Sequence, residues 1–285
     1  MGLVAAVVAA FVLFGSSSNP TFDPIAQAAT VSSDSPGYRM HMSLSLTSSV
    51  LNDPITGYGD AVIDPRHHAV SSSFVIDYSS LPQAAQVFGG TSTMRVDMIE
   101  SGRVVYLKLP QALVGAIPNL GGKPWIEMNL AKLAGVPGLS SLGDPTSTDP
   151  AQVLQYLHAA SDGVTNEGQQ RVDGVMTTHY HADLSLDRLA ADVPPADQGA
   201  LEQALTKLRQ TMGGVDVPVD VWVDAHQLVR QTSMSMALHV AGAPSVEETV
   251  VADLTDYGPQ PSPTLPPADQ VLDASSLASG LGVSG

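Results

Sequence analysis

The sequence of 285 residues contains no cysteine and few basic side chains. Without cysteine it can form no disulfide, thiolate metal site or cysteine nucleophile, and it lacks the acylated cysteine that anchors a bacterial lipoprotein. Charged residues make up only 14% of the chain, against roughly 25% in typical soluble proteins, so uncharged polar residues must cover much of the surface. The formal net charge of −16 opposes binding to phosphate backbones, and we expect no nucleic-acid partner.

Motifs of common catalytic chemistry are also missing. The sequence contains no Gly-x-Ser-x-Gly nucleophile elbow, no Walker loop and no His-Glu-x-x-His zinc motif. It therefore predicts a non-enzymatic protein without a cofactor.

An uncharged apolar run at residues 2–15 is followed by a polar break at residues 16–20. We predict a signal or anchor segment over residues 1–15 and a linker over residues 16–23; a buried core helix is the alternative. The run is shorter than the roughly 20 residues that span a bilayer and lacks the expected basic residues before it. This pattern indicates either a start placed too late or a short anchor whose basic leader is missing.

Ala26-Gln27-Ala28 resembles a signal cleavage site. It falls inside a predicted helix over Asp23–Ala29, with Pro24 at the first helical position, so an uncleaved anchor is favoured. We expect an exported protein of the cell envelope, on the extracytoplasmic face of the membrane or secreted.

From Tyr38 onward the apolar pattern has period two, which is typical of half-buried strands. The predicted strands cover residues 38–47, 57–63, 69–77, 93–100, 103–109, 125–128, 164–170, 175–184, 217–224, 228–240 and 246–257. Asp173-Gly174 is a strong hairpin signal between two of them. Helices are predicted from Asp149 to Gly163 and over residues 195–212.

This element order excludes a doubly wound sheet, because strands do not alternate with crossover helices. The sequence predicts an α+β, mainly β, antiparallel domain over residues 24–257 and a Pro/Ser-rich tail over residues 258–285.

Several short segments resemble the LolA-like superfamily, and most closely the actinobacterial envelope lipoproteins of the LppX/LprG type. The matching segments are Pro24-Ile25-Ala26-Gln27-Ala28-Ala29 before Pro36-Gly37-Tyr38-Arg39-Met40, Gly122-Lys123-Pro124-Trp125-Ile126, Gly174-Val175 to Thr178-His179-Tyr180, and Val217-Pro218-Val219-Asp220-Val221-Trp222-Val223-Asp224. The resemblance implies a strongly curved antiparallel sheet, an open half-barrel, wrapped around helices and enclosing an apolar cavity for acyl chains. The missing lipobox cysteine means that lipid anchoring is not implied.

Methionines occur in pairs at i and i+2 or i and i+4 on three predicted strands. Their flexible thioethers suit a cavity that accepts ligands of varying shape, although ordinary core packing is the alternative. Together with the cavity implied by the resemblance, this pattern predicts apolar ligand-binding residues at Met40, Met42, Leu44, Met94, Val96, Met98, Val105, Leu107, Trp125, Tyr180, Met234, Met236 and Leu238.

The expected ligand is a lipid, lipoglycan or acyl chain, with the membrane contacted through the N-terminal segment. The alternative is an envelope scaffold or sensor with a filled core, which binds a protein or cell-wall partner.

Two polar clusters have simpler interpretations. His179 and His181 could point at one metal ion, but two ligands do not make a site, so we predict that both face solvent while Tyr180 faces the core. Asp220 and Asp224 could perform acid–base chemistry, but no nucleophile accompanies them. We interpret them as a solvated strand face.

Overall fold

The computed structural model describes residues 24–81, 90–114, 121–129, 161–185, 216–238 and 244–273, and there the chain is mainly β. The strands are β1 (Tyr38–Ser48), β2 (Ile55–Asp64), β3 (Ala69–Asp77), β4 (Thr93–Ser101), β5 (Val104–Lys108), β6 (Trp125–Asn129), β7 (Ser161–Val172), β8 (Val175–Ser185), β9 (Asp216–Asp224), β10 (Val229–Leu238), β11 (Val246–Thr255) and β12 (Val271–Asp273). The helices are α2 (Pro24–Ser33), α4 (Gln111–Val114) and the short 3-10 turns η1 (Pro65–His67) and η2 (Ala268–Gln270).

The chain divides into two compact units. Unit 1 contains residues 1–35, 42–54 and 148–255, and unit 2 contains residues 36–41, 55–147 and 256–285. Among the described residues, no helix is both long enough and apolar enough to cross a bilayer.

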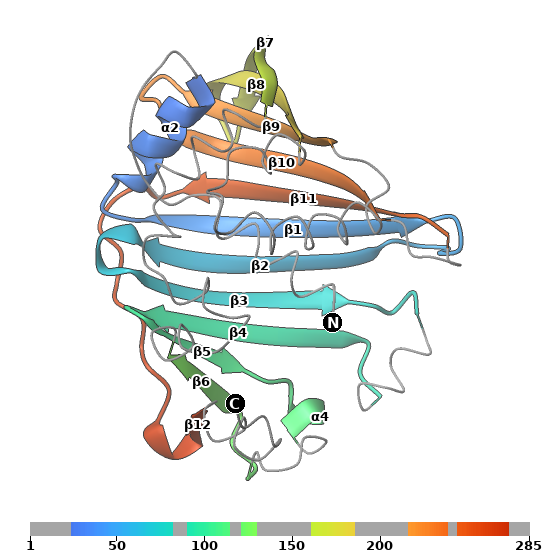
Figure 1. The fold of residues 1–285 in the computed structure, drawn as a ribbon, viewed down its shortest axis with the longest axis vertical. Helices are drawn as coiled ribbons and strands as arrows, with labels where there is room; N and C mark the ends of the chain where they lie inside the picture. The colour runs from blue at the N-terminus through green and yellow to red at the C-terminus, as the bar shows by residue number, and fades with distance from the viewer. Residues whose placement is uncertain are drawn as a thin grey trace, which may run out of the picture. The chain divides into compact units, whose positions relative to one another are not determined.

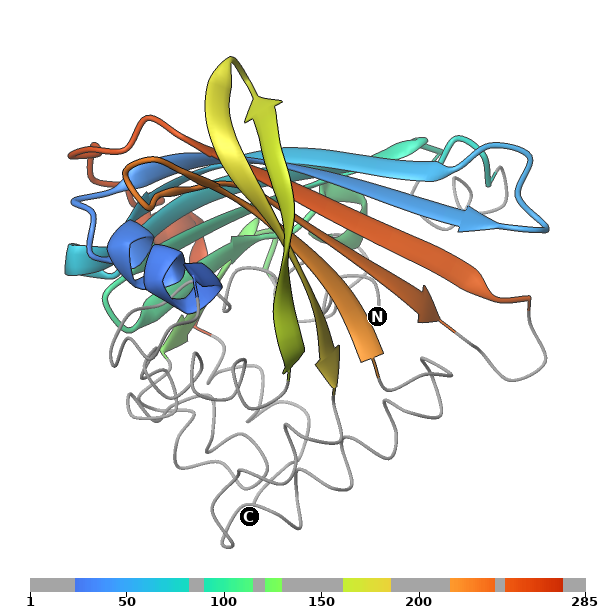
Figure 2. The same ribbon diagram turned by 90° about the horizontal axis from the view of Figure 1, so that it is seen from above.

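Unit 1 is built on the strand order β1-β11-β10-β9-β8-β7, and the pairs from β7 to β11 are antiparallel. Asp173 and Gly174 connect β7 and β8 with φ angles of 45° and 82°, as the hairpin signal in the sequence predicts. Helix α2 lies beside the turn between β9 and β10 (Figures 1 and 2), where the Ser32 hydroxyl accepts a 2.9 Å hydrogen bond from the Val229 N–H.

Unit 2 has the strand order β12-β6-β5-β4-β3-β2-β1, in which β2 to β6 form an antiparallel meander (Figure 1). Short turns at residues 65–68 and 102–103 join neighbouring strands, so sequential strands become neighbours in the sheet.

Phe74 of β3 covers two glycines of β2. A Cβ atom on Gly59 would lie 2.5 Å from Phe74 Cδ2, and one on Gly57 would lie 2.8 Å from Phe74 Cε1. The buried ring therefore occupies the space that side chains at these two positions would fill.

The C-terminal segment returns to unit 2. Gly258 N–H donates to the Gly37 carbonyl at 2.8 Å, and β12 pairs in parallel with β6 while Lys123 Nζ donates to the Val271 carbonyl at 2.8 Å. Part of the predicted tail is thus a strand. The sequence pattern could not reveal this pairing, because three residues are too few to show a period.

The mainly β, antiparallel architecture predicted from the sequence is confirmed, with β12 as a parallel exception. The prediction that Gly163 ends a helix is wrong, because Gly163 lies within β7 and has a φ of 119°. The N-terminal apolar segment, most of the predicted helix after Asp149 and the helix over residues 195–212 lie outside the described residues.

We expect Gly59→Ala to lower the free energy of unfolding by about 1–3 kcal/mol, because the new methyl group must displace the Phe74 ring or the Ser73 carbonyl. Urea denaturation followed by circular dichroism measures this change. Thr56→Ala, at an exposed position of the same strand, is the matched control and should change the free energy much less. An equal effect of the two substitutions would contradict the close packing of Phe74 on Gly59.

Candidate functional site

Strands β3, β4 and β5 place apolar side chains on one face of unit 2. Met94, Val96 and Met98 lie directly opposite Ile76, Phe74 and Ser72, and Met98 lies opposite Leu107. Directly opposed residues of antiparallel strands project from the same face. We call the set Phe74, Ile76, Met94, Val96, Met98, Val105 and Leu107 the apolar face of unit 2.

The side chains on this face differ in exposure. Phe74 and Ile76 are buried, whereas the three apolar residues of β4 and the two of β5 are half-buried. The predicted ligand-binding residues of β4 and β5 therefore share one surface and keep part of their area open.

Trp125 lies on the other face of unit 2. It is opposite Lys108, whose Nζ lies 5.6 Å from the Trp125 ring centroid and 3.4 Å from Asp97 Oδ2. Leu107, one residue before Lys108, projects to the opposite side. This corrects the expectation that Trp125 lies with Met98 and Leu107; the connection over residues 109–124 hides the relative facing of β5 and β6 from the sequence.

Strands β8 to β11 form a similar surface in unit 1. Tyr180 is opposite Val221, and Met234 is opposite both Val219 and Val250. Met236 continues the same face of β10, and Leu238 pairs with Val246 in the register of β10 and β11. We call the set Tyr180, Ala182, Val219, Val221, Met234, Met236, Val250 and Ala252 the apolar face of unit 1. Of the predicted residues in this set, Tyr180, Met234 and Met236 are half-buried.

The predicted residues of β1 are more deeply enclosed. Met40 is 4% exposed, and Met42 and Leu44 are each 3% exposed. This burial agrees with the core-packing alternative for the β1 methionines, whereas the methionines of β4 and β10 retain accessible area.

Each apolar face also carries one glutamate that the sequence analysis missed. Glu100 is opposite Val105 in unit 2, and Glu248 is opposite Met236 in unit 1. Burial raises the pKa of both carboxyl groups. The period-two pattern contains the signal, since Glu100 follows Met94, Val96 and Met98 and Glu248 precedes Val250, each at an apolar position of its strand.

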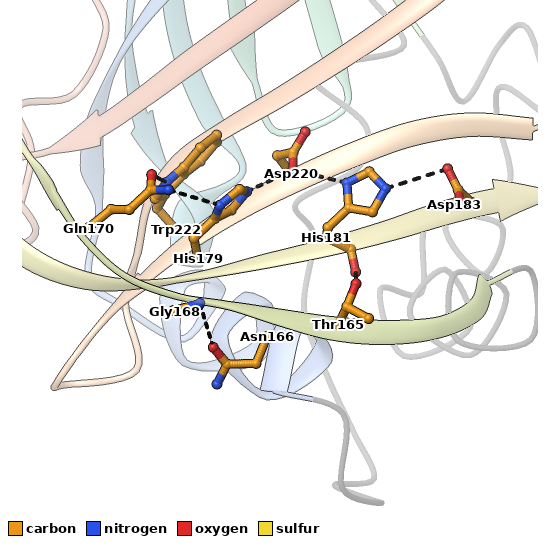
Figure 3. Close-up of polar contacts among 9 residues, drawn as sticks. All are labelled: Thr165, Asn166, Gly168, Gln170, His179, His181, Asp183, Asp220 and Trp222. Carbon is orange, nitrogen blue, oxygen red and sulfur yellow. Dashed lines mark hydrogen bonds and ion pairs between the residues drawn. The ribbon is translucent and has the colours of Figure 1, made fainter.

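A polar network covers the other face of β8 and β9 (Figure 3). His179 Nε2 donates to Asp220 Oδ1 at 2.7 Å, and His181 Nδ1 donates to the same oxygen at 3.0 Å. The His179 ring stacks on Trp222 at 4.4 Å between centroids. Tyr180 projects to the apolar face between the two histidines, as the sequence predicts.

Gln170 of β7 completes this network. The Gln170 Oε1 accepts from Trp222 Nε1 at 2.8 Å, and the Gln170 Nε2 donates to His179 Nδ1 at 3.3 Å. Because His179 Nδ1 is the acceptor, the ring proton of His179 is on its own Nε2. The side chain of His179 is only 14% exposed and that of His181 is 33% exposed. The expectation that both imidazoles face solvent is therefore wrong for His179.

The network is ordered by hydrogen bonds between its own members. Both imidazoles donate to one carboxylate oxygen, and the described residues contain no group of three or more histidine or acidic side chains arranged to hold a metal ion. The hydrogen bond to Asp220 raises the pKa of His181 against the effect of burial, and Asp183 and Glu167 add to the rise.

Asp224 organises the turn between β9 and β10. Its Oδ1 accepts from the N–H groups of His226 and Leu228 at 2.8 and 3.0 Å, and its Oδ2 accepts from Arg230 Nε at 2.7 Å and forms an ion pair with Arg230 Nη2 at 2.7 Å. Burial by itself raises the pKa of Asp224, but these hydrogen bonds outweigh it and hold the pKa below its usual range. The interpretation of Asp224 as a solvated residue is wrong, because its side chain is 2% exposed.

Comparison with known proteins finds no matching family model. A relative described as an uncharacterized 31.2 kDa protein in the rplA-rplJ intergenic region of Streptomyces griseus is 30% identical over 159 residues. The match covers 54% of this chain and 50% of that protein, so the chain spans about half the length of the curated relative.

Three solved structures are similar at low identity. Lipoprotein LppX of Mycobacterium tuberculosis has a TM-score of 0.41 at 13% identity, covering 84% of this chain and 95% of LppX. LprF of Mycobacterium bovis has a TM-score of 0.40 at 12% identity, covering 87% and 99%. A DUF1329 family protein of Desulfovibrio piger has a TM-score of 0.27 at 10% identity, covering 85% and 93%. LppX is of the type that the sequence resembles. These TM-scores carry no argument about function, which has to rest on the residues of this chain.

Asp224→Asn should lower the free energy of unfolding by about 3 kcal/mol, because it leaves the Arg230 guanidinium without its buried anionic partner. Urea denaturation at neutral pH measures the loss. Asp220→Asn, four residues away on β9 and about a third exposed, is the control and should cost much less. Equal losses of unfolding free energy in the two variants would mean that the buried ion pair between Asp224 and Arg230 adds no stability of its own.

The His181 imidazole should titrate above about pH 6.5, and Asp220→Asn should lower its midpoint. A raised pKa means that the folded state holds the proton more tightly than the unfolded chain. The interaction therefore stabilises the fold fully below about pH 6.5, and its contribution is lost as pH rises through the raised pKa.

NMR titration of the His181 ring protons tests this expectation. Asp60→Asn, which removes the 2.9 Å partner of His41 in unit 2, is the control and should leave the His181 midpoint unchanged. An unchanged midpoint in Asp220→Asn would show that Asp220 does not stabilise the protonated His181 imidazole.

Proposed function

We propose that this protein binds the acyl chains of a lipid or lipoglycan outside the cytoplasm, at the cell envelope. The observation that carries the proposal is the row of half-buried apolar side chains on β4 and β5, which includes Met94 and Met98. It rests also on the sequence resemblance to LppX/LprG-type lipoproteins.

The chemistry of this row suits a flexible hydrocarbon. Five neighbouring apolar residues, Met94, Val96, Met98, Val105 and Leu107, share one face and keep accessible area. Burying a methylene group contributes about 0.8 kcal/mol, so one long acyl chain can be held without a charged contact. Unbranched thioethers adapt to chains of different shape.

The apolar face of unit 1 offers a second surface of the same kind through Met234, Met236 and Tyr180. The enclosed side chains of Met40, Met42 and Leu44, which belong to β1, serve as core. The proposed membrane attachment is through the N-terminal apolar segment, residues 1–15.

The double substitution Met94→Gln and Met98→Gln should weaken acyl-chain binding by about tenfold or more, because two amide groups replace apolar contact area on this face. Displacement of the neutral fluorophore N-phenyl-1-naphthylamine by 1-palmitoylglycerol gives the affinity. Native mass spectrometry of the protein purified from its expression host reports lipid retained during purification.

Met176→Gln is the matched control, because Met176 is 47% exposed at the hairpin between β7 and β8. It should bind 1-palmitoylglycerol as the wild-type chain does. A wild-type chain that carries no lipid and does not bind 1-palmitoylglycerol would exclude the proposal and favour the filled-core scaffold or sensor.

A further inference from the structure

Glu248 is the most deeply buried carboxyl group among the described residues. It is 1% exposed, and its Oε1 has no hydrogen-bond partner. Its neighbour Glu247 projects to the other side of β11 and is exposed. Two adjacent glutamates therefore have opposite environments, which are set by the alternation of the strand.

The neighbours of Glu248 on β10 and β11 are apolar. Met236 lies directly opposite on β10, and the next residues on the same face are Met234 of β10 and Val246 and Val250 of β11. No cationic side chain stands at these positions. Burial accordingly raises the pKa of the Glu248 carboxyl group, which favours its neutral form.

A buried polar atom without a hydrogen-bond partner destabilises a fold, and such atoms are rare in native proteins. An apolar residue at position 248 would fill the same space without the cost of burying a polar atom. The positions before and after it on the same face, Val246 and Val250, are both valine. A neutral carboxyl group carries one O–H donor and one carbonyl acceptor, so it can bond to either kind of polar atom on a ligand.

We propose that Glu248 is the polar anchor of a lipid site on the apolar face of unit 1, where its carboxyl group hydrogen-bonds to an uncharged oxygen of the ligand, such as an ester carbonyl or a hydroxyl. This inference rests on the proposed lipid-binding function and assigns the ligand a neutral polar linkage beside its acyl chain. Apolar contacts hold the chain, and Glu248 fixes how far along the face the linkage lies.

Met236 is the neighbour of Glu248 that can most easily move. This residue is half-buried and lies directly opposite Glu248 on β10. An unbranched thioether changes rotamer at low cost, so an incoming ligand can displace it and reach the carboxyl group from this side.

An anionic headgroup does not fit this position, because the chain carries a formal net charge of −16 and the neighbours of Glu248 on β10 and β11 offer no cation. An amine would require the carboxyl group to ionise among apolar side chains, which burial opposes. A neutral ester or hydroxyl has neither cost.

The test compares three ligands of equal chain length on the full chain: 1-palmitoylglycerol, hexadecane and hexadecylamine, each delivered from cyclodextrin and measured by displacement of N-phenyl-1-naphthylamine. Glu248→Leu should weaken binding of 1-palmitoylglycerol by about three- to tenfold, the range of one hydrogen bond, and leave hexadecane unchanged. Glu248→Gln keeps a donor and an acceptor and should retain binding of 1-palmitoylglycerol.

Glu247→Gln is the matched control for Glu248→Gln and should change no affinity, because Glu247 lies on the opposite face. Thermal unfolding of each variant shows that it folds; removal of a buried ionisable group should leave the Glu248 variants at least as stable as the wild-type chain.

Unchanged 1-palmitoylglycerol affinity in Glu248→Leu, with hexadecane still bound, would overturn the role of Glu248 alone. Preferred binding of hexadecylamine, abolished in Glu248→Gln, would overturn the neutral linkage in favour of an ionised cation site. A wild-type chain that binds none of the three ligands would instead overturn the lipid-binding function, and the role of Glu248 with it.

Discussion

Hydrogen bonding between neighbouring antiparallel strands determines which side chains meet in this protein. Once two strands are in register, directly opposed residues share a face, and the next residue of each strand projects to the other side. Tyr180 joins Val221 in this way, while His179 and His181 join Trp222 and Asp220 on the reverse of the same two strands. One strand pair thereby supports an apolar surface and a polar network that do not interfere with each other.

The same constraint explains why one residue type serves different purposes. Asp224 and Glu248 are both buried acids, yet Asp224 accepts three hydrogen bonds at a turn and forms an ion pair with Arg230, whereas Glu248 stands among methionine and valine with one oxygen unpartnered. Partners hold the pKa of Asp224 low, and desolvation raises that of Glu248. Asp224 is therefore a structural anion, whereas burial shifts Glu248 toward its neutral form, the form in which we propose that it contacts a ligand.

The methionines fall into two groups that differ in burial. Those of β1 are enclosed, so their thioethers contribute packing, whereas those of β4 and β10 are half-buried on faces that continue across neighbouring strands. A binding surface for hydrocarbon needs apolar area that is still open in the unliganded protein. The β4 and β10 residues keep such area, and the β1 residues do not.

The sequence by itself determined the strands, because period-two patterning and turn residues are local properties of the chain. Residues 69–77 match β3 at both ends, and Asp173-Gly174 marks the β7–β8 hairpin. It also determined that Tyr180 and the two histidines face opposite ways. Only the tertiary structure decided that Trp125 faces away from Met98, that residues 271–273 pair with β6, and that Glu248 is buried. Each of these depends on the register or covering of strands that are distant in the chain, and a local pattern contains no information about such partners.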